Sequence, residues 1–378
     1  MKRHILVMVS ILMAFMSSKA DFTIGLIPDT QKMVLSDTET KKFNANMKWY
    51  VDKSDSLKLA FVSHLGDIVD TKTGVTAEWQ RAQTAMNILK ADSMAYTMCQ
   101  GNHDDIINFR KYFPVSDWEG KSYFGGIKAL GGLENAFYLF KLDGMDFIVV
   151  VIETAYKTQL NPASWDWANQ ILTQYKDRRA IIVSHNINES GGSNIVNIAK
   201  NHDNVFLVLG GHSCIREHSW TEKNLAGTKT IHFFVQDYQC DDLKTTGANI
   251  RFYTFKPLEN KVYAYTYSAW NDRWERDSNS EFSFAYDMTG AVVAVDDQIA
   301  NSNPKMAIQY NRISNLITLS NGQEIRKVSI MSANGQLLMH KENNTTTAIS
   351  TNNLPNGVYF VTIQKEDGEN IAKNITKF

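Results

Sequence analysis

LAFVSHLGDIVD, residues 59–70, joins an apolar run to a loop that carries two aspartates. The run at 59–65 has the length and composition of a buried strand, and Gly66 marks the turn after it. Asp67 therefore lies where a strand ends, which is where α/β sheets place their functional residues. A single aspartate in such a place is more often a turn residue or a helix cap than a ligand.

The same arrangement of an apolar run followed by polar side chains recurs four more times along the chain. The loops read PDTQ (28–31), GNHD (101–104), SHN (184–186) and GGHS (210–213), after strands predicted at 22–27, 95–99, 180–185 and 205–211. Five such loops, in order, predict one shared site at the carboxyl ends of the strands.

The segments between these strands have helical periodicity. Amphipathic helices are predicted at 39–54, between Trp79 and Leu89, at 163–175 and near 193–201. Asp143-Gly144, between two apolar runs in 137–153, predicts a β-hairpin, and 231–267 is mostly strand. The pattern predicts a layered α/β domain with two sheets and helices packed outside them.

Composition and the two ends of the chain set further bounds. The 378 residues carry a formal net charge of -1 and no dense Lys/Arg run, so a nucleic acid partner is not expected. Lys2, Arg3, the apolar stretch 5–16 and small residues up to Ala20 predict a signal peptide at 1–20. Its apolar core is shorter than the roughly 20 residues that span a membrane, so no transmembrane segment is expected. The other predicted divisions are the α/β domain at 21–288, a linker at 289–305 and a small all-β domain at 306–378.

With these loops in view, residues 21–285 resemble the calcineurin-like metallophosphoesterases, whose pattern is D-x-H, G-D-x-x-D, G-N-H-D/E, a lone His and G-H-x-H. The resemblance implies a four-layer α/β/β/α metallophosphoesterase sandwich and a centre for two divalent ions. Two ions about 3.5 to 4 Å apart compensate phosphoryl charge and supply a hydroxide at neutral pH. The ions expected are one or two of Mn, Fe, Zn or Ca.

The resemblance also assigns a role to each loop residue. Asp67 bridges the two ions and Asp29 binds the first ion, together with positions 31 and 214. The remaining ligands of the second ion are Asn102, His185 and His212. His103 would protonate the leaving oxygen, with Asp104 orienting its imidazole.

Two positions depart from the family pattern, and both belong to the first ion. Gln31 and Cys214 stand where the pattern has histidines. Three interpretations remain open: a remodelled two-metal site with Gln31 and Cys214 as ligands, a lost first ion, or Cys214 as a small buried residue. The three cysteines, Cys99, Cys214 and Cys240, are odd in number, so at least one thiol is expected to be free.

The C-terminal stretch resembles the sorting domain of the type IX secretion system. The element L-x-x-G-x-Y-x-x-x-I is present as Leu354, Gly357, Tyr359 and Ile363. Small carbohydrate-binding or structural β modules are the alternative. With the signal peptide, the tail predicts export to the cell surface or the medium, with the export machinery as a partner.

The sequence thus predicts an exported phosphoric ester hydrolase. Its substrate is a phosphate monoester or diester, attacked by a hydroxide bound to metal, with His103 as the acid. The alternative is a non-catalytic surface protein that binds metal and a phosphorylated ligand on the same fold. His64, inside a strand, is expected to be a satisfied core residue or a support behind the ligands, and not a ligand itself. QDYQC (236–240) fits either a site loop or a surface loop.

Overall fold

The chain divides into two compact units, Met1–Val293 and Ala294–Phe378, each of which is described by itself. The computed structural model describes residues 20–71, 75–153, 162–188, 192–244 and 247–288 of the first unit. In the second unit it describes residues 308–311, 316–319, 325–332, 336–342, 348–355, 357–365 and 370–377. The predicted signal peptide, except Ala20, and the predicted linker lie outside the described residues.

The first sheet of the N-terminal unit has the strand order β13-β12-β11-β1-β2-β3, with β14 paired to β12. The bounds are β1 (Phe22–Ile27), β2 (Leu59–His64), β3 (Tyr96–Thr97), β11 (Ile250–Lys256), β12 (Lys261–Ser268), β13 (Arg273–Glu275) and β14 (Phe282–Ala285). Strands β1, β2 and β3 are parallel, whereas β11 runs antiparallel to β1. Residues 22–27 are buried on both faces, which explains why they are apolar except for Thr23, whose hydroxyl is hydrogen-bonded to that of Thr254.

The second sheet has the order β4-β5-β6-β7-β8-β10-β9. The bounds are β4 (Phe124–Ile127), β5 (Ala136–Leu142), β6 (Met145–Val151), β7 (Arg179–Val183), β8 (Val205–Gly210), β9 (Glu217–Lys223) and β10 (Thr230–Gln236). Strands β6, β7, β8 and β10 are parallel. The predicted hairpin is present: β5 pairs with β6 through Asp143 and Gly144, at φ 49° and 75°.

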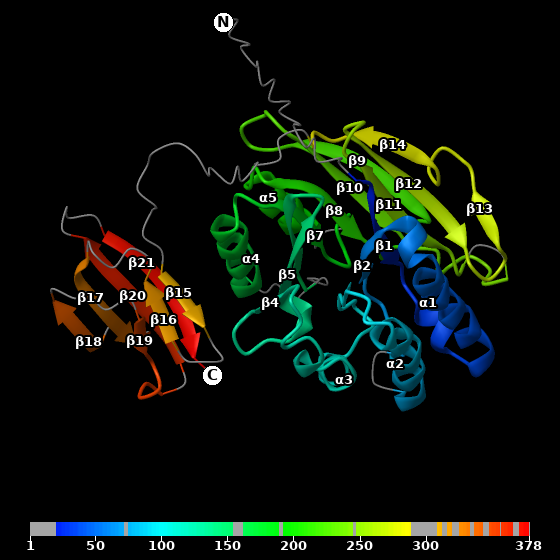
Figure 1. Ribbon diagram of the computed structural model, residues 1–378. Coiled ribbons are helices and arrows are strands. Elements are labelled where there is room, and N and C mark those ends of the chain that lie inside the picture. The colour runs from blue at the N-terminus through cyan, green and yellow to red at the C-terminus, as the bar shows by residue number, and fades with distance from the viewer. Residues whose placement is uncertain are drawn as a thin grey trace, which may run out of the picture. The chain divides into compact units, whose positions relative to one another are not determined.

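The two sheets pack face to face, and helices cover their outer faces (Figure 1). Between the sheets the ring centroids of Phe22 and Phe147 lie 5.5 Å apart, and those of Phe61 and Phe140 lie 4.5 Å apart. The helices are α1 (Asp37–Leu57), α2 (Thr76–Ala91), α3 (Ile106–Tyr112), α4 (Pro162–Gln174) and α5 (Gly192–Lys200). Short 3₁₀ turns lie at η1 (Gln31–Val34), η2 (Val115–Asp117) and η3 (Leu133–Asn135). The expected α/β/β/α sandwich is confirmed.

Element boundaries follow local chemistry that the periodicity alone did not resolve. Helix α1 begins two residues before the predicted 39, because the Ser36 hydroxyl accepts a hydrogen bond from the Glu39 amide. It ends at Leu57, and Lys58, the residue that caps it, takes the left-handed conformation with φ 48°. Strand β3 is limited to two residues, although 95–99 was predicted as strand.

The C-terminal unit is built from two antiparallel sheets, β15-β16-β19 and β18-β17-β20-β21. The bounds are β15 (Ile308–Asn311), β16 (Leu316–Leu319), β17 (Ile325–Ser332), β18 (Leu337–Glu342), β19 (Ala348–Ser350), β20 (Gly357–Lys365) and β21 (Asn370–Lys377). Ile317 and Ile349 of one sheet share a core with Val361 and Ile375 of the other. The expectation of a small all-β domain is confirmed.

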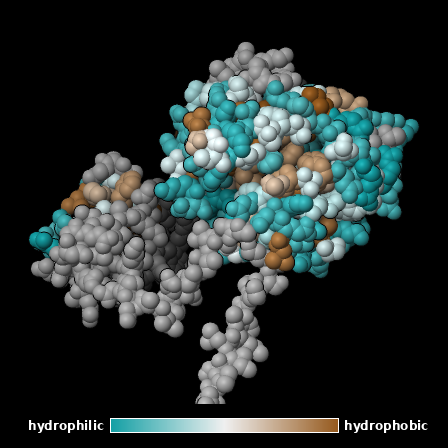
Figure 2. All heavy atoms as spheres, turned by 90° about the horizontal axis from the view of Figure 1, so that it is seen from above, coloured by the Kyte–Doolittle hydropathy of each residue, from teal (hydrophilic) through white to brown (hydrophobic). Residues whose placement is uncertain are grey.

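The surface of the N-terminal unit is dominated by hydrophilic side chains on the face shown in Figure 2, around a small group of hydrophobic ones. Among the described residues, no helix has the length and apolar content needed to cross a membrane.

A buried ion pair links an interior strand of the first sheet to the edge strand β9 of the second. Arg251 of β11 lies 2.6 Å from the Glu217 carboxylate of β9, and their side chains are only 1% and 7% exposed. Glu217 also accepts hydrogen bonds from Tyr238, Thr266 and Ser280. A buried carboxylate needs such donors because it is costly to remove from water.

Arg251→Met is expected to lower the free energy of unfolding by about 3 to 5 kcal/mol, because Glu217 would remain buried without its cation. Arg273→Met is the matched control, since its pair with Glu275 is half exposed and contributes about 0 to 1 kcal/mol. Urea unfolding followed by tryptophan fluorescence measures both, and all 8 tryptophans precede residue 289, so the signal reports only the N-terminal unit. Equal losses in the two variants would contradict the role of the pair.

Candidate metal centre

All five predicted loops lie at the carboxyl ends of parallel strands. Asp29, Asp67 and GNHD (101–104) follow β1, β2 and β3 in the first sheet. His185 and His212 follow β7 and β8 in the second. Because the sheets pack face to face, the loops from the two sheets meet at one edge of the sandwich.

Two glycines allow the loops to approach more closely than any side chain would permit. A Cβ added at Gly101 would lie 2.1 Å from the backbone nitrogen and Oδ1 of Asp67. A Cβ at Gly211 would lie 2.1 Å from Oδ1 of Asp29. Steric crowding therefore requires glycine at positions 101 and 211, whether or not the chain resembles any family.

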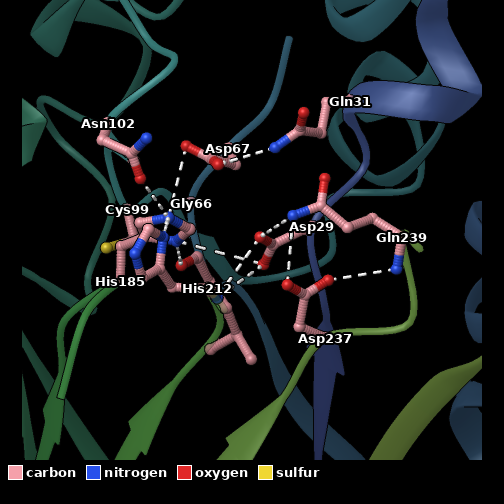
Figure 3. Close-up of polar contacts among 12 residues, drawn as sticks. Asp29, Gln31, Gly66, Asp67, Cys99, Asn102, His185, His212, Asp237 and Gln239 are labelled. Carbon is pink, nitrogen blue, oxygen red and sulfur yellow. Dashed lines mark hydrogen bonds and ion pairs between the residues drawn. The ribbon is translucent and has the colours of Figure 1, made fainter. Parts of the chain in front are cut away.

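His185 is the centre of the cluster. Its Nδ1 lies 3.0 Å from the carbonyl oxygen of Leu65, and because a carbonyl only accepts, Nδ1 carries a proton and donates it. Nε2 then faces Oδ1 of Asn102 at 3.1 Å, Oδ1 of Asp67 at 3.3 Å and Nδ1 of His212 at 3.2 Å. Figure 3 shows Asn102 and His212 turned toward His185, with Asp67 beside them.

Four atoms with lone pairs thus converge: Nε2 of His185, Oδ1 of Asn102, Oδ1 of Asp67 and Nδ1 of His212. Because lone pairs repel one another, a positive charge is needed among them. Burial by itself would lower the pKa of His185, but the carboxylates of Asp67 and Asp29 outweigh it and raise that pKa to about 10. Burial pushes the pKa of Asp67 upward, but His185 and His103 together more than offset it, so the pKa is lowered. A divalent cation bound among these atoms would supply the same positive charge.

The donor set fits such an ion. Asp67, His185 and His212 offer ligand atoms that all lie within 4.8 Å of one another. Carboxylate oxygen with imidazole nitrogen suits zinc, manganese or iron. The hydrogen bond from Nδ1 of His185 to Leu65 is the outer contact that fixes the tautomer of a metal-binding histidine.

The backbone at two of these residues is held in the left-handed region. Asp67 has φ 51° and His212 has φ 67°, values that residues with a Cβ seldom adopt. Such conformations persist where the surrounding contacts enforce them and often mark functional sites.

His64 is the satisfied core residue that the sequence predicts. Its Nδ1 accepts from the Gly66 amide at 3.0 Å, so Nε2 is protonated and donates to the Thr30 hydroxyl at 3.1 Å. Burial lowers the pKa of His64 to about 3, so the ring stays neutral. It joins the loop after β1 to the loop after β2.

The predicted pairing of His103 with Asp104 is wrong. Nδ1 of His103 lies 2.6 Å from the carbonyl oxygen of Asp70, which therefore orients the ring. The Asp104 carboxylate instead accepts from the amides of Ile68, Val69 and Gly101. Buried carboxylates need donors, and three backbone amides satisfy this one, so Asp104 fastens the two loops together.

Cys214 as a metal ligand is also wrong. Its sulfur forms a disulfide with Cys240, and both residues are exposed. A sulfur in a disulfide carries no thiolate charge to bind an ion, so the remodelled site with Cys214 as a ligand is excluded. Because Cys214 is exposed, it is not a small buried residue either. Cys99 is free and buried, as expected for at least one thiol.

The loop after β10 adds two residues that were not assigned to the site. Asp237 and Gln239 are buried, and Nε2 of Gln239 donates to Oδ2 of Asp29 at 3.2 Å and of Asp237 at 3.0 Å. Burial, and then the Asp237 charge, raise the pKa of Asp29 well above its usual value. The sequence pattern could have indicated these two residues, because QDYQC follows an apolar strand as the other five loops do.

Comparisons with known proteins bear on the two units separately. Residues 311–377 match the model of the secretion system C-terminal sorting domain. The uncharacterized protein YvnB of Bacillus subtilis (strain 168) is 25% identical over 309 residues, which cover 76% of this chain and 23% of YvnB. The chain thus spans less than a quarter of the length of that relative.

Two solved structures are similar to the chain. A dimetal phosphatase from Danio rerio shares 14% identity, with 70% of this chain and 99% of that chain covered and a TM-score of 0.45. A hypothetical protein from Thermus thermophilus shares 12% identity, with 70% and 100% covered and a TM-score of 0.38.

The geometry of the N-terminal unit is that of an α/β/β/α sandwich with Asp67, His185 and His212 clustered where its parallel strands end. The C-terminal unit is a secretion system C-terminal sorting domain.

Gly101→Ala is expected to abolish binding of the ion at Asp67, because the new methyl group would overlap the Asp67 backbone nitrogen and carboxylate. Gly120→Ala is the control, since a Cβ there meets no atom within 4 Å and adds only backbone strain. Metal content of the purified protein, measured by mass spectrometry, separates them. Full metal content in Gly101→Ala would show that the close approach is not required.

Proposed function

We propose that the N-terminal unit is a metal-dependent phosphoric ester hydrolase that acts on a phosphate monoester or diester. The observation that carries this proposal is the convergence of Asp67, Asn102 and two histidines on one point, with His103 hydrogen-bonded to the same Asp67. The His103 amide donates to Oδ1 of Asp67 at 2.9 Å. The backbone of the residue proposed as the acid is therefore anchored to a carboxylate of the cation-binding cluster.

The metal ligands in this proposal are Asp67, Asn102, His185 and His212. A divalent ion held by them would supply positive charge to the phosphoryl oxygens and make a coordinated water more acidic. Burial of Asp67 and His185 keeps bulk water from competing for the same atoms. The fixed tautomer of His185 keeps a lone pair, and not a proton, toward the ion.

His103 is proposed as the acid for the leaving oxygen. Nδ1 donates to the Asp70 carbonyl, so the proton that can be transferred is the one on Nε2 of the imidazolium. Asp70 is itself held by Lys32, whose Nζ lies 2.6 Å from its carboxylate. The ring thus has one orientation, which is what a general acid needs in order to deliver a proton.

His103→Ala is expected to lower kcat/KM by about 10² to 10⁴ for an alkyl phosphate, whose alkoxide leaves poorly without a proton. The loss should be much smaller for a nitrophenyl phosphate, because nitrophenolate leaves without protonation. Steady-state kinetics with both esters measure the difference, and unchanged metal content shows that the centre is intact. Equal losses for both leaving groups would contradict the assignment of His103 as the acid.

His232→Ala is the matched control variant, since His232 lies on β10 outside the cluster and burial lowers its pKa to about 4. It should leave both rates unchanged. Binding of phosphorylated compounds without turnover of any ester would favour a non-catalytic binding protein instead.

We also propose that the chain is exported to the cell surface or the medium. The support is the sorting domain at 311–377, together with the signal peptide expected at 1–20. A disulfide on the exposed loops of the N-terminal unit fits an oxidising compartment.

A chain that ends at residue 310 should remain inside cells that carry the matching secretion system, because it lacks the sorting domain. The full chain with His103→Ala is the control and should be exported normally. Cell fractionation with immunoblotting measures both. Release of the truncated chain to the surface would contradict the proposed route.

A further inference from the structure

Two glutamine amides lie where the family pattern would place the first ion. Nε2 of Gln31 is 2.6 Å from Oδ2 of Asp67, and Nε2 of Gln239 contacts Oδ2 of Asp29 and of Asp237. In Figure 3, Gln31, Gln239 and Asp237 lie on one side of the cluster and His185 and Asn102 on the other. In each of these contacts a carboxyl oxygen accepts, so the amide nitrogen of the glutamine is the donor and faces it.

The side chains at this place do not fit a second ion. The pattern calls for imidazoles at positions 31 and 214, each offering a lone pair. Gln31 offers an N–H donor to Asp67 instead, and the sulfur of Cys214 is bonded to Cys240. With its nitrogen on Asp67, the Gln31 amide turns its oxygen, the atom able to bind a divalent ion, away from that carboxylate (Figure 3). A disulfide sulfur has no thiolate charge to offer an ion.

The disulfide holds the second amide in position. It joins the loop after β8 to the loop after β10, with Cα atoms 5.4 Å apart. The Cys214 amide donates to Oδ2 of Asp237 at 2.8 Å, which is the same oxygen that Gln239 contacts. Cys214 and Gln239 thus fix Asp237 from two sides, and Gln239 spans the gap to Asp29.

We propose that this centre holds a single divalent ion, on Asp67, Asn102, His185 and His212, and that the amides of Gln31 and Gln239 replace the other ion. The inference rests on the proposed function, since it concerns the same site. The amides give the carboxylates of Asp29, Asp67 and Asp237 the hydrogen bonds that burial demands. They supply no Lewis-acid charge, so the reaction has one cation to use where the family pattern provides two.

The test is the number of ions per chain. The full-length oxidised protein is loaded with excess Mn²⁺, freed of unbound ions by gel filtration and analysed by mass spectrometry. One ion per chain is expected, and electron paramagnetic resonance should show an isolated Mn²⁺ and not a spin-coupled pair. The variant Gln31→His with Cys214→His and Cys240→Ser restores the pattern and should bind two.

Matched variants make the result decisive. Cys214→Ser with Cys240→Ser removes only the disulfide and should still bind one ion, whereas His185→Asn should bind none. Two ions in the wild-type chain, with ester hydrolysis intact, would overturn the inference and leave the proposed function standing. No ion and no hydrolysis would overturn both. A folded restored variant that still binds one ion would also contradict the role given to Gln31 and the disulfide.

Discussion

The hydrogen bond from Nδ1 of His185 to the carbonyl of Leu65 sets the geometry on which the candidate metal centre depends. It crosses from the loop after β7 to the loop after β2, so it links the two sheets at the edge where the polar loops converge. The same bond fixes the imidazole tautomer and leaves Nε2 aimed at Asp67 and His212. The position of His185 and its chemistry therefore have one physical cause.

Burying several carboxylates within a small volume imposes the second constraint, and the chain meets it in two ways. Asp67 faces two imidazoles, where a cation is the natural partner. Asp29 and Asp237 instead receive N–H donors from Gln239 and from the loop around His212. One cluster thus contains a group that can bind a cation and carboxylates that are hydrogen-bonded by amides. Asp67 belongs to both sets, because it also accepts a hydrogen bond from Gln31.

Most of the fold could be predicted from the sequence because it is encoded locally. Helix α2 buries Trp79 and Leu89 at helical spacing, and the Asp143-Gly144 turn requires only its two residues. The strand-end loops could be predicted by the same local reasoning. The Cys214–Cys240 disulfide could not, because it needs β10 to lie beside β8, with β9 at the sheet edge. The partners of His103 and Asp104 likewise depend on side-chain direction, which residue spacing does not contain.

Anomalous X-ray scattering from crystals of the full chain grown with Mn²⁺ would locate the ion directly. One strong anomalous peak is expected within bonding distance of Nε2 of His185, a carboxylate oxygen of Asp67 and a ring nitrogen of His212. The carboxylates of Asp29 and Asp237 should show only their amide contacts. A cluster without a peak, or with its strongest peak between Asp29 and Asp237, would show that Asp67, His185 and His212 do not hold the ion.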